Sequence, residues 1–261
     1  MNLPIIQSLW IGESLTTIEQ LCINSFLYHG HEFHLYTYDN ILNVPSGTTV
    51  KDANEILDNS KVFTYCNGRV SGFADWFRLE MLNKKGGFWV DMDVICLKPF
   101  KFNNDDAIFG LETSEVICNA VLGFSQNHKF VKYMIDINLN PNKILPYDNV
   151  EYKKIKIIRR IKGHGLAETE WGEISEPKGM TKALVHFDIF KDSKPKEFFF
   201  PIHYSDWKLI YYSDLKINSD YFKDSYALHL WNEMSRNEPG FDKNTTFSKN
   251  SLIEKLKEKY M

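Results

Sequence analysis

The sequence predicts an α/β protein with a mixed, mostly parallel central sheet flanked by helices. Residues 5–11 are mostly apolar, residues 16–28 carry apolar positions at helical spacing, and residues 33–38 alternate between apolar and polar. This order of strand, helix and strand is typical of parallel strands joined by a crossover helix. Further along, a helical pattern at residues 72–84 leads directly into an apolar run that ends in Asp91-Met92-Asp93.

Ligands of a parallel sheet bind at the edge formed by the carboxyl ends of its strands. The first predicted strand ends at Trp10-Ile11-Gly12, and the second ends at Asp39-Asn40. We therefore expect these two segments to lie at one ligand-binding edge.

The helix at residues 72–84 is the clearest pattern in the middle of the chain. Phe73, Phe77 and Met81 recur at helical spacing, and Gly86-Gly87 supplies the stop. The remaining patterns predict a short helical stretch near residues 53–57, strands at 107–112 and 117–124, a helix at 128–137, mostly irregular chain at 138–180, strand-like runs at 198–202 and 226–231, and a charged helix at 251–260.

Composition favours one domain over residues 1–261. The 261 residues are 43% hydrophobic and 15% aromatic, which is enough to form a substantial core. The formal net charge is −3, with 31 basic and 34 acidic residues. This balance provides no overall basic field, so nucleic acid is excluded as the expected partner.

The cysteines and the N-terminal residues favour a cytoplasmic protein. No pair of cysteines has the spacing of a metal or redox motif, so all four are expected to be buried, reduced thiols; they are Cys22, Cys66, Cys96 and Cys118. The first residues show no basic leader, and no apolar run approaches the ~18 residues of a membrane span. We expect neither export nor a membrane-spanning segment.

The pair Asp91 and Asp93 predicts a metal site. If residues 89–93 are extended, both carboxylates project to the same side and can share one divalent cation. Two adjacent negative charges at the end of an apolar strand repel each other unless a cation lies between them. The alternative is a pair of turn or capping acids.

Asp75 and Arg78 are three residues apart on the preceding helix and share a face. One interpretation is a surface ion pair. The other is that the guanidinium of Arg78 binds a diphosphate through two parallel hydrogen bonds.

Three motifs occur along the chain in a fixed order: Ala74-Asp75-Trp76-Phe77-Arg78, Gly86-Gly87-Phe88-Trp89-Val90-Asp91-Met92-Asp93 and His229-Leu230-Trp231-Asn232. Together they resemble the signatures of the Asp-x-Asp sugar-binding-region glycosyltransferases, family 32, which are related to the glucosylating domains of large clostridial toxins. Residues 5–12 resemble the first strand of that family. Two departures are Trp89, where tyrosine is more usual, and the segment Pro177-Lys178-Gly179-Met180-Thr181-Lys182, which only loosely matches a later family element.

The resemblance implies a GT-A fold, which is a Rossmann-like sheet that binds a nucleotide-sugar, and a divalent metal, Mn²⁺ or Mg²⁺, that bridges the diphosphate. It also implies transfer with retention of anomeric configuration. The nucleotide-binding half would be about residues 1–125, and residues 126–261 would complete the metal site and bind the acceptor. The implied metal ligands are Asp91, Asp93 and His229; the implied donor-binding residues are Trp10, Ile11, Gly12, Asp39, Asn40, Asp75, Arg78, Trp89, Met92, Trp231 and Asn232.

Retention requires either a carboxylate nucleophile or attack of the acceptor on the face that the leaving group vacates. Glu112 and Asn119 follow the Asp-x-Asp pair at or near strand ends, and each is either near the anomeric carbon or a structural hydrogen-bonding residue. His229 alone would be interpreted as a core histidine. With the acidic pair and Trp231-Asn232 it is predicted to be a metal ligand.

The segment from Lys153 to Lys162 is a basic amphipathic pattern. As a helix, it would place its isoleucines on one broad side and Lys153, Lys156, Arg159 and Arg160 mostly opposite. It would then either contact an anionic membrane or pack on its own domain with a solvated basic face.

The predicted function is a metal-dependent retaining glycosyltransferase. It would move a hexose or N-acetylhexosamine from a UDP-sugar to a saccharide or lipid-linked saccharide acceptor, in the synthesis of a bacterial capsule, O-antigen or lipopolysaccharide. It would act in the cytoplasm or at the inner face of the membrane. The alternatives are a phosphohydrolase or nucleotidyltransferase, which typically uses more carboxylates for two metals, and a non-catalytic glycan-binding protein, favoured only by the aromatic content.

Overall fold

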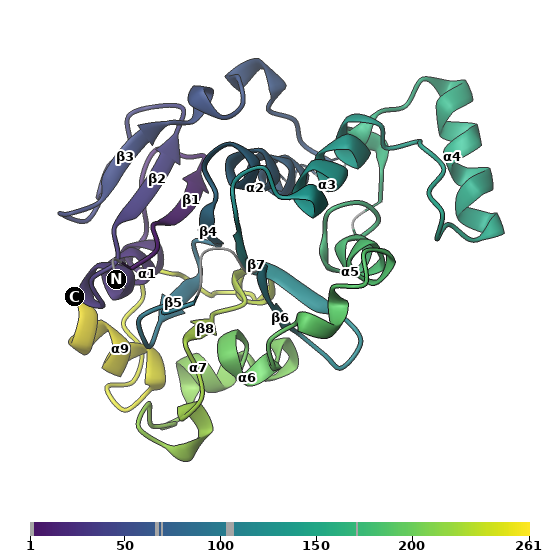
Figure 1. Cartoon of the computed structure of the whole chain (residues 1–261). Coiled ribbons are helices and arrows are strands. Elements are labelled where there is room, and N and C mark those ends of the chain that lie inside the picture. The colour runs from purple at the N-terminus through teal and green to yellow at the C-terminus, as the bar shows by residue number, and fades with distance from the viewer. Residues whose placement is uncertain (1–2, 66–67, 69, 103–106, 171) are drawn as a thin grey trace.

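The computed structural model describes residues 3–65, 68, 70–102, 107–170 and 172–261. Its central sheet has six strands in the order β3-β2-β1-β4-β7-β6 (Figure 1). The first four are parallel neighbours, and β7 pairs antiparallel with both β4 and β6. The strands are β1 (Ile6–Trp10), β2 (Phe33–Thr37), β3 (Thr49–Asp52), β4 (Gly87–Val90), β6 (Ile108–Leu111) and β7 (Ile117–Phe124). The expected mixed, mostly parallel sheet is confirmed.

Helices cover both faces of this sheet, because consecutive side chains of a strand point to opposite sides. Phe88 of β4 packs in the core under α1 and α9, whereas its neighbour Trp89 packs in the core under α2, α3 and α5. The helices are α1 (Thr17–Tyr28), α2 (Ser71–Lys85), α3 (Lys129–Leu139), α4 (Val150–Lys162), α5 (Pro177–His186), α6 (Lys196–Phe199), α7 (Lys208–Tyr212), α8 (Asn232–Arg236) and α9 (Leu252–Tyr260), with single 3₁₀ turns at Ala53–Glu55, Asn59–Lys61, Leu166–Glu168, Phe190–Asp192, Tyr204–Asp206 and Asp220–Phe222.

Most predicted elements are confirmed, and residues 49–52, 138–180 and 198–202 differ. The strand expected at residues 198–202 is wrong: α6 forms there instead, and the Phe200 amide donates to the Lys196 carbonyl. The pattern misled because Phe199 and Phe200 fill the core from a short helix rather than from a strand. The sequence also gave no sign of β3, an edge strand whose alternate residues are exposed. The interval 138–180, expected to be mostly irregular, contains α4 and the start of α5.

Gly86 ends α2 and turns the chain into β4. Its φ of 67° lies in the left-handed region, and a Cβ there would stand 2.7 Å from the backbone nitrogen of Gln126. Only glycine fits both requirements. The Gly-Gly stop predicted from the sequence is therefore correct and sets where the strand begins.

The Asp-x-Asp segment is not extended as predicted. Strand β4 ends at Val90, and Asp91, Met92 and Asp93 form a turn in which the Val94 amide donates to the Asp91 carbonyl at 3.1 Å. The chain then enters β5 (Val94–Cys96), which pairs antiparallel with β8 (Ala227–His229) in a separate two-stranded sheet. The segment turns because it passes from one sheet to the other, and this pairing brings residue 229 alongside residue 94.

Three of the predicted cysteines are buried free thiols: Cys22, Cys96 and Cys118. Cys66 lies outside the described residues. None of the helices within the described part of the chain combines the length and apolar character needed to cross a bilayer.

Candidate metal and donor site

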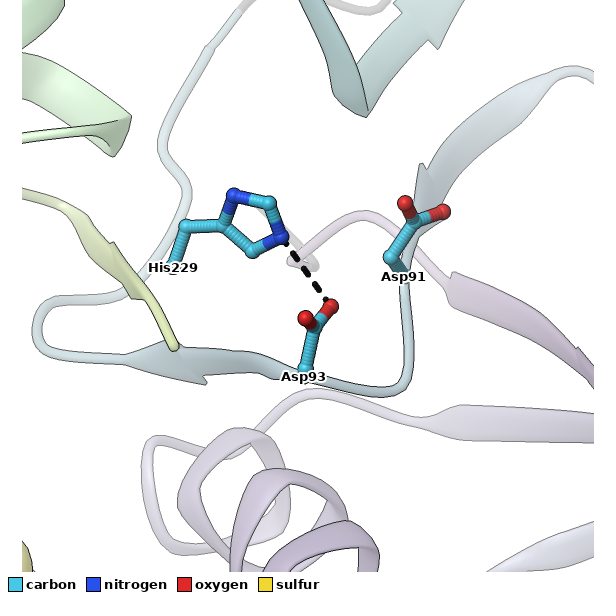
Figure 2. A group of neighbouring side chains, drawn as sticks. All are labelled: Asp91, Asp93 and His229. Atoms are coloured by element: carbon cyan, nitrogen blue, oxygen red, sulfur yellow. Dashed lines mark hydrogen bonds and ion pairs between the residues drawn. The ribbon is translucent and has the colours of Figure 1, made fainter. Parts of the chain in front are cut away.

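Asp91, Asp93 and His229 come together at the carboxyl edge of the parallel strands. Figure 2 shows their side chains facing a common space, with Asp91 just after β4, Asp93 before β5 and His229 at the end of β8. One ligand atom from each lies within 4.8 Å of the others. The structure therefore brings together the three residues that the motifs imply, although they are up to 138 positions apart in the chain.

Asp93 is a buried carboxylate with its hydrogen bonds satisfied. The His229 ring nitrogen Nε2 is 3.1 Å from Oδ1, and the Asn232 backbone amide donates to Oδ2 at 2.8 Å. Burial by itself raises the pKa of Asp93, but the charge and hydrogen bond of His229 and the Asn232 amide outweigh it and lower the pKa to about 2. Asp93 is therefore ionised at neutral pH.

The backbone at Trp231 aims the Asn232 amide at Asp93. Trp231 has a φ of 56°, a left-handed conformation that costs a non-glycine residue on the order of 1 kcal/mol. Its indole Nε1 donates to the Ile202 carbonyl at 2.8 Å, and its ring lies 4.1 Å from that of His229. These contacts hold Trp231 in its strained conformation. Trp231 therefore affects the site by fixing the position of the Asn232 amide.

Asp91 is held by two donors on its Oδ1 atom. The Trp89 indole Nε1 donates at 2.7 Å, and Arg78 Nη2 donates at 2.8 Å. Trp89 is buried and its ring also lies under the Arg78 guanidinium at 5.0 Å. Trp89, which stands where tyrosine is more usual, thus supplies a donor that orients Asp91. Its indole N–H points to this carboxylate.

Arg78 makes several contacts within the protein through its two Nη nitrogens. Besides Asp91, its Nη1 donates to the Asn119 carbonyl at 2.7 Å and lies 3.1 Å from Asp75. The Asn119 amide nitrogen donates to Asp75 at 3.0 Å and to the Ser175 carbonyl at 3.2 Å. The pair with Asp75 is therefore buried rather than on the surface, and both Nη nitrogens bind protein oxygens; a contact between Arg78 and a diphosphate stays a prediction.

Asn119 joins this buried network instead of standing free beside the site. Burial raises the pKa of Asp75 well above its usual value in spite of Arg78, and the neighbouring Glu176 carboxylate raises it further. Glu176 is itself buried and accepts a hydrogen bond from the Tyr65 hydroxyl. Glu176 was not predicted from the sequence. The only sequence feature that could have indicated a role for it is its place just before the loosely matched segment that begins at Pro177.

Glu112 lies within electrostatic reach of the metal ligands. It follows β6, and burial raises its pKa while the charges of His229 and His203 lower it. Its carboxyl therefore shares a neighbourhood with two histidines, of which His203 was missed because nothing in its spacing marked it. Cys118, which was also missed, lies close enough to His229 to raise the pKa of the His229 imidazole.

The other predicted donor-side residues occupy the same edge with different exposure. Gly12 lies against Trp10, since a Cβ on Gly12 would stand 3.0 Å from the indole Nε1. Ile11, Asp39 and Asn40 are exposed after the ends of β1 and β2, whereas Met92 is buried in the core under α1.

Among the described residues, four buried polar atoms of this neighbourhood have no hydrogen-bond partner: Trp10 Nε1, Arg78 Nε, His229 Nδ1 and Asn232 Oδ1. Buried polar groups are normally paired, so these atoms fit a polar ligand. Two ligands at about 2.1 Å from one octahedral ion stand about 3 to 4.2 Å apart. The ligand atoms of Asp91, Asp93 and His229 all lie within 4.8 Å of one another, so these residues fit a single Mn²⁺ or Mg²⁺. Carboxylate and imidazole donors suit Mn²⁺.

We predict that Trp89→Phe weakens Mn²⁺ binding about tenfold to a hundredfold, because it removes one of the two donors that orient Asp91. Calorimetric titration of Mn²⁺ measures the effect. Trp76→Phe is the matched control, because its indole donates to Glu80 at 3.2 Å, away from the ligands. Equal losses in both variants would contradict the assignment.

We also predict that Mn²⁺ binds more tightly as the pH rises. Burial lowers the pKa of His229, but Asp93 and Cys118 raise it more strongly, so it lies well above 6.5. The metal-free imidazole is then protonated at neutral pH, and Nε2 must lose this proton to bind an ion.

Below the pKa of His229, the affinity should therefore rise about tenfold per pH unit with release of about one proton. Calorimetry in two buffers of different ionisation enthalpy counts the protons. An affinity that is constant across this range would contradict a ligand role for His229.

Two family models match this chain. Residues 19–114 match the family region described as "Glycosyltransferase sugar-binding region containing DXD motif", and residues 173–260 match the "Alpha 1,4-glycosyltransferase conserved region". The first region includes Asp91 and Asp93, and the second includes His229. Together the matched regions thus contain the whole ligand set.

Two curated relatives are similar over much of this chain. An alpha-1,4-N-acetylglucosaminyltransferase of Homo sapiens is 24% identical over 80% of this chain and 58% of its own length. A lactosylceramide 4-alpha-galactosyltransferase of Gorilla gorilla gorilla is 25% identical over 62% of this chain and 45% of its own length. The chain thus spans about half the length of these relatives.

Among solved structures, one described as PaToxG Glycosyltransferase has a TM-score of 0.49 at 16% identity, and the match covers 71% of this chain and 70% of that one. The similarity to a family rests on the two family matches, because together they contain every member of the Asp91, Asp93 and His229 cluster. They show that the chain is similar to the glycosyltransferases of the Asp-x-Asp sugar-binding-region type, the family that its motifs resemble.

Proposed function

We propose that this chain is a metal-dependent, retaining glycosyltransferase that moves a hexose or N-acetylhexosamine from a UDP-sugar. The observation that carries the proposal is the meeting of Asp91, Asp93 and His229 at the carboxyl edge of the sheet. Parallel sheets bind nucleotides at this edge. Trp10 Nε1 and Asn232 Oδ1, which have no hydrogen-bond partner, lie in the same neighbourhood and can bind polar groups of a donor sugar nucleotide.

The proposed reaction requires little from the protein beyond positioning and charge stabilisation. Breaking the bond between sugar and diphosphate leaves negative charge on phosphate oxygens, and a bound divalent cation stabilises that charge as a Lewis acid. The protein residues hold the ligands in place: Arg78 and Trp89 fix Asp91, and the Asn232 amide fixes Asp93. Because nucleoside diphosphate is a competent leaving group, positioning and charge stabilisation supply most of the effect.

The relatives support the sugar class and the stereochemistry. Their names specify N-acetylglucosamine or galactose transfer to form an alpha-1,4 linkage. From an alpha-linked UDP-sugar, an alpha product means retention. In the double-displacement route Glu112 would be the nucleophile, since its carboxyl lies near His229 and its raised pKa reflects burial; in the front-face route it would orient the acceptor.

On this proposal the chain works as one domain. Residues 1–125 supply the donor edge and the two carboxylates, and residues 126–261 supply His229 and the acceptor side. The acceptor is a saccharide or a lipid-linked saccharide. A role in bacterial surface polysaccharide synthesis at the inner face of the cytoplasmic membrane stays a prediction of the sequence.

Two other functions are less well supported. A two-metal phosphohydrolase or nucleotidyltransferase would need a second set of ligands, and the described residues offer one group of three. A non-catalytic glycan-binding protein has no need for Asp93, a buried carboxylate held ionised beside a histidine.

A panel of nucleotide-sugars tests the proposal. We expect one or a few UDP-sugars to raise the melting temperature only when Mn²⁺ is present, and the same donors to be slowly hydrolysed. Stabilisation that is independent of metal, or hydrolysis of UDP alone to UMP, would contradict it.

A further inference from the structure

Helix α4 presents three of its isoleucines to the outside and buries two of its cations. Ile157, Ile158 and Ile161 are 45%, 52% and 80% exposed, whereas Lys156 and Arg159 are buried. Of the two arrangements considered from the sequence, this one differs from a helix whose isoleucines pack on its own domain and whose basic face is solvated. Figure 1 shows α4 at the margin of the molecule, beyond α3 and α5 and away from the strands.

Two buried ion pairs fix α4 in this rotation. Lys156 Nζ donates to both carboxylate oxygens of Asp148 at 2.8 and 3.1 Å. Arg159 donates through Nη1 and Nη2 to the two oxygens of Glu173 at 2.9 and 2.5 Å. Turning the isoleucines inward would leave these buried carboxylates without partners, which is strongly unfavourable. The apolar face is therefore held outward by the fold.

The outward face combines apolar and basic residues. Val150, Ile157 and Ile161 recur at i, i+7 and i+11, so they share one side of the helix, and Ile158 lies beside them. The exposed charged residues of α4 on and around this side are Lys153, Lys154, Arg160 and Lys162 against the single acid Glu151, a net charge of +3.

A hollow beside the helix adds to this basic character. It has a volume of about 620 Å³ and is lined in part by Leu139, Lys143, Arg160 and His164. Lys143 bonds Asp136 at 2.5 Å, and Arg160 donates to the Asn142 carbonyl at 2.9 Å. The Lys143 charge is thus balanced by Asp136, whereas Arg160 bonds only a neutral carbonyl and keeps its positive charge beside the exposed apolar side of α4.

These features favour an anionic lipid surface over a second copy of this chain. A twofold dimer through this face would bring two sets of excess positive charge together, which opposes association. A bilayer rich in anionic lipid accepts isoleucines between its acyl chains and attracts the flanking cations, the combination found in helices that lie in the interface.

We propose that the outward face of α4, made of Val150, Ile157, Ile158 and Ile161 with their flanking lysines and Arg160, docks the protein on an anionic membrane surface. The helix lies in the plane of the interface and does not cross the bilayer. This docking depends on neither the metal nor the donor, so it stands or falls independently of the proposed function.

Vesicle sedimentation tests the proposal, with neither Mn²⁺ nor nucleotide-sugar present. We expect the full chain to bind vesicles of phosphatidylglycerol and phosphatidylcholine in equal parts, to bind phosphatidylcholine vesicles much less, and to be released by salt. The double variant Ile157→Ser/Ile161→Ser should bind the anionic vesicles at least about tenfold more weakly.

Val185→Ser is the matched control, because it removes an exposed aliphatic side chain from α5 outside this face. It should bind vesicles like the unchanged chain. Melting temperatures confirm that each variant is folded.

Equal binding by the double variant, or no preference for anionic vesicles, would overturn the proposal. So would analytical ultracentrifugation that shows a dimer which the double variant loses, without vesicle binding, because the occupant of the face would then be a second copy.

Discussion

Asp93→Ala should lose glycosyl transfer by about 10³-fold or more, because a metal that stabilises the leaving group supplies several kcal/mol. Asp93 contributes a ligand, and it also aligns His229 and accepts the Asn232 amide. Its removal therefore disturbs two of the three ligands at once. Metal-dependent binding of UDP should fall with turnover, and both are measurable by calorimetry and by release of UDP.

Asp93→Asn keeps the shape of the side chain and an acceptor for the Asn232 amide, and it guards against a failure of the Ala variant to fold. It should retain the melting temperature within a few degrees and still lose most turnover. Asp214→Ala, at an exposed aspartate, is the control and should behave like the unchanged chain. Unchanged metal-dependent UDP affinity in the Asp93 variants would contradict a ligand role.

Arg78→Lys should lower kcat/KM about a hundredfold although the charge is retained, an effect of the size seen when groups that orient metal ligands are lost. The guanidinium donates to Asp91 and to the Asn119 carbonyl and pairs with Asp75. A single ammonium cannot hold all three groups. One or more buried acceptors would lose their partner, which destabilises the fold by about 1–3 kcal/mol.

Kinetics, Mn²⁺ affinity and thermal unfolding should be measured together for this variant. Because Arg78 acts through Asp91, the Mn²⁺ affinity should fall along with kcat/KM. Arg236→Lys, at an exposed arginine paired with Glu233 on α8, is the matched control and should change little. Normal Mn²⁺ affinity with reduced turnover would show instead that Arg78 contacts the donor directly.

The meeting of Asp91, Asp93 and His229 could be expected from the sequence because three motifs together resemble one family, which implies these residues as metal ligands. The apolar run and the Gly86-Gly87 stop mark β4, and the acids follow it directly. The way in which the acids converge could not be predicted, because it depends on a change of sheet. Strand β5 pairs with β8, and nothing local at residue 94 specifies a partner 135 positions later, His229.

The role of Arg78 and the orientation of α4 had the same kind of cause. Arg78 has a spacing that fits either a surface pair or a phosphate contact, and only the tertiary fold brings Asn119 and Asp91 to its nitrogens. In α4 the helical period was predicted correctly, but hydrophobicity alone could not decide whether the isoleucines pack on the domain or face outward. The decisive partners, Asp148 and Glu173, lie outside the helix.

The most direct test of the account is anomalous diffraction at the manganese edge from crystals soaked with Mn²⁺ and UDP. If these residues bind the metal, we expect one strong peak about 2 to 2.5 Å from oxygens of Asp91 and Asp93 and from Nε2 of His229, with the diphosphate on its open side. A peak elsewhere, or UDP bound with no peak between these three residues, would contradict it.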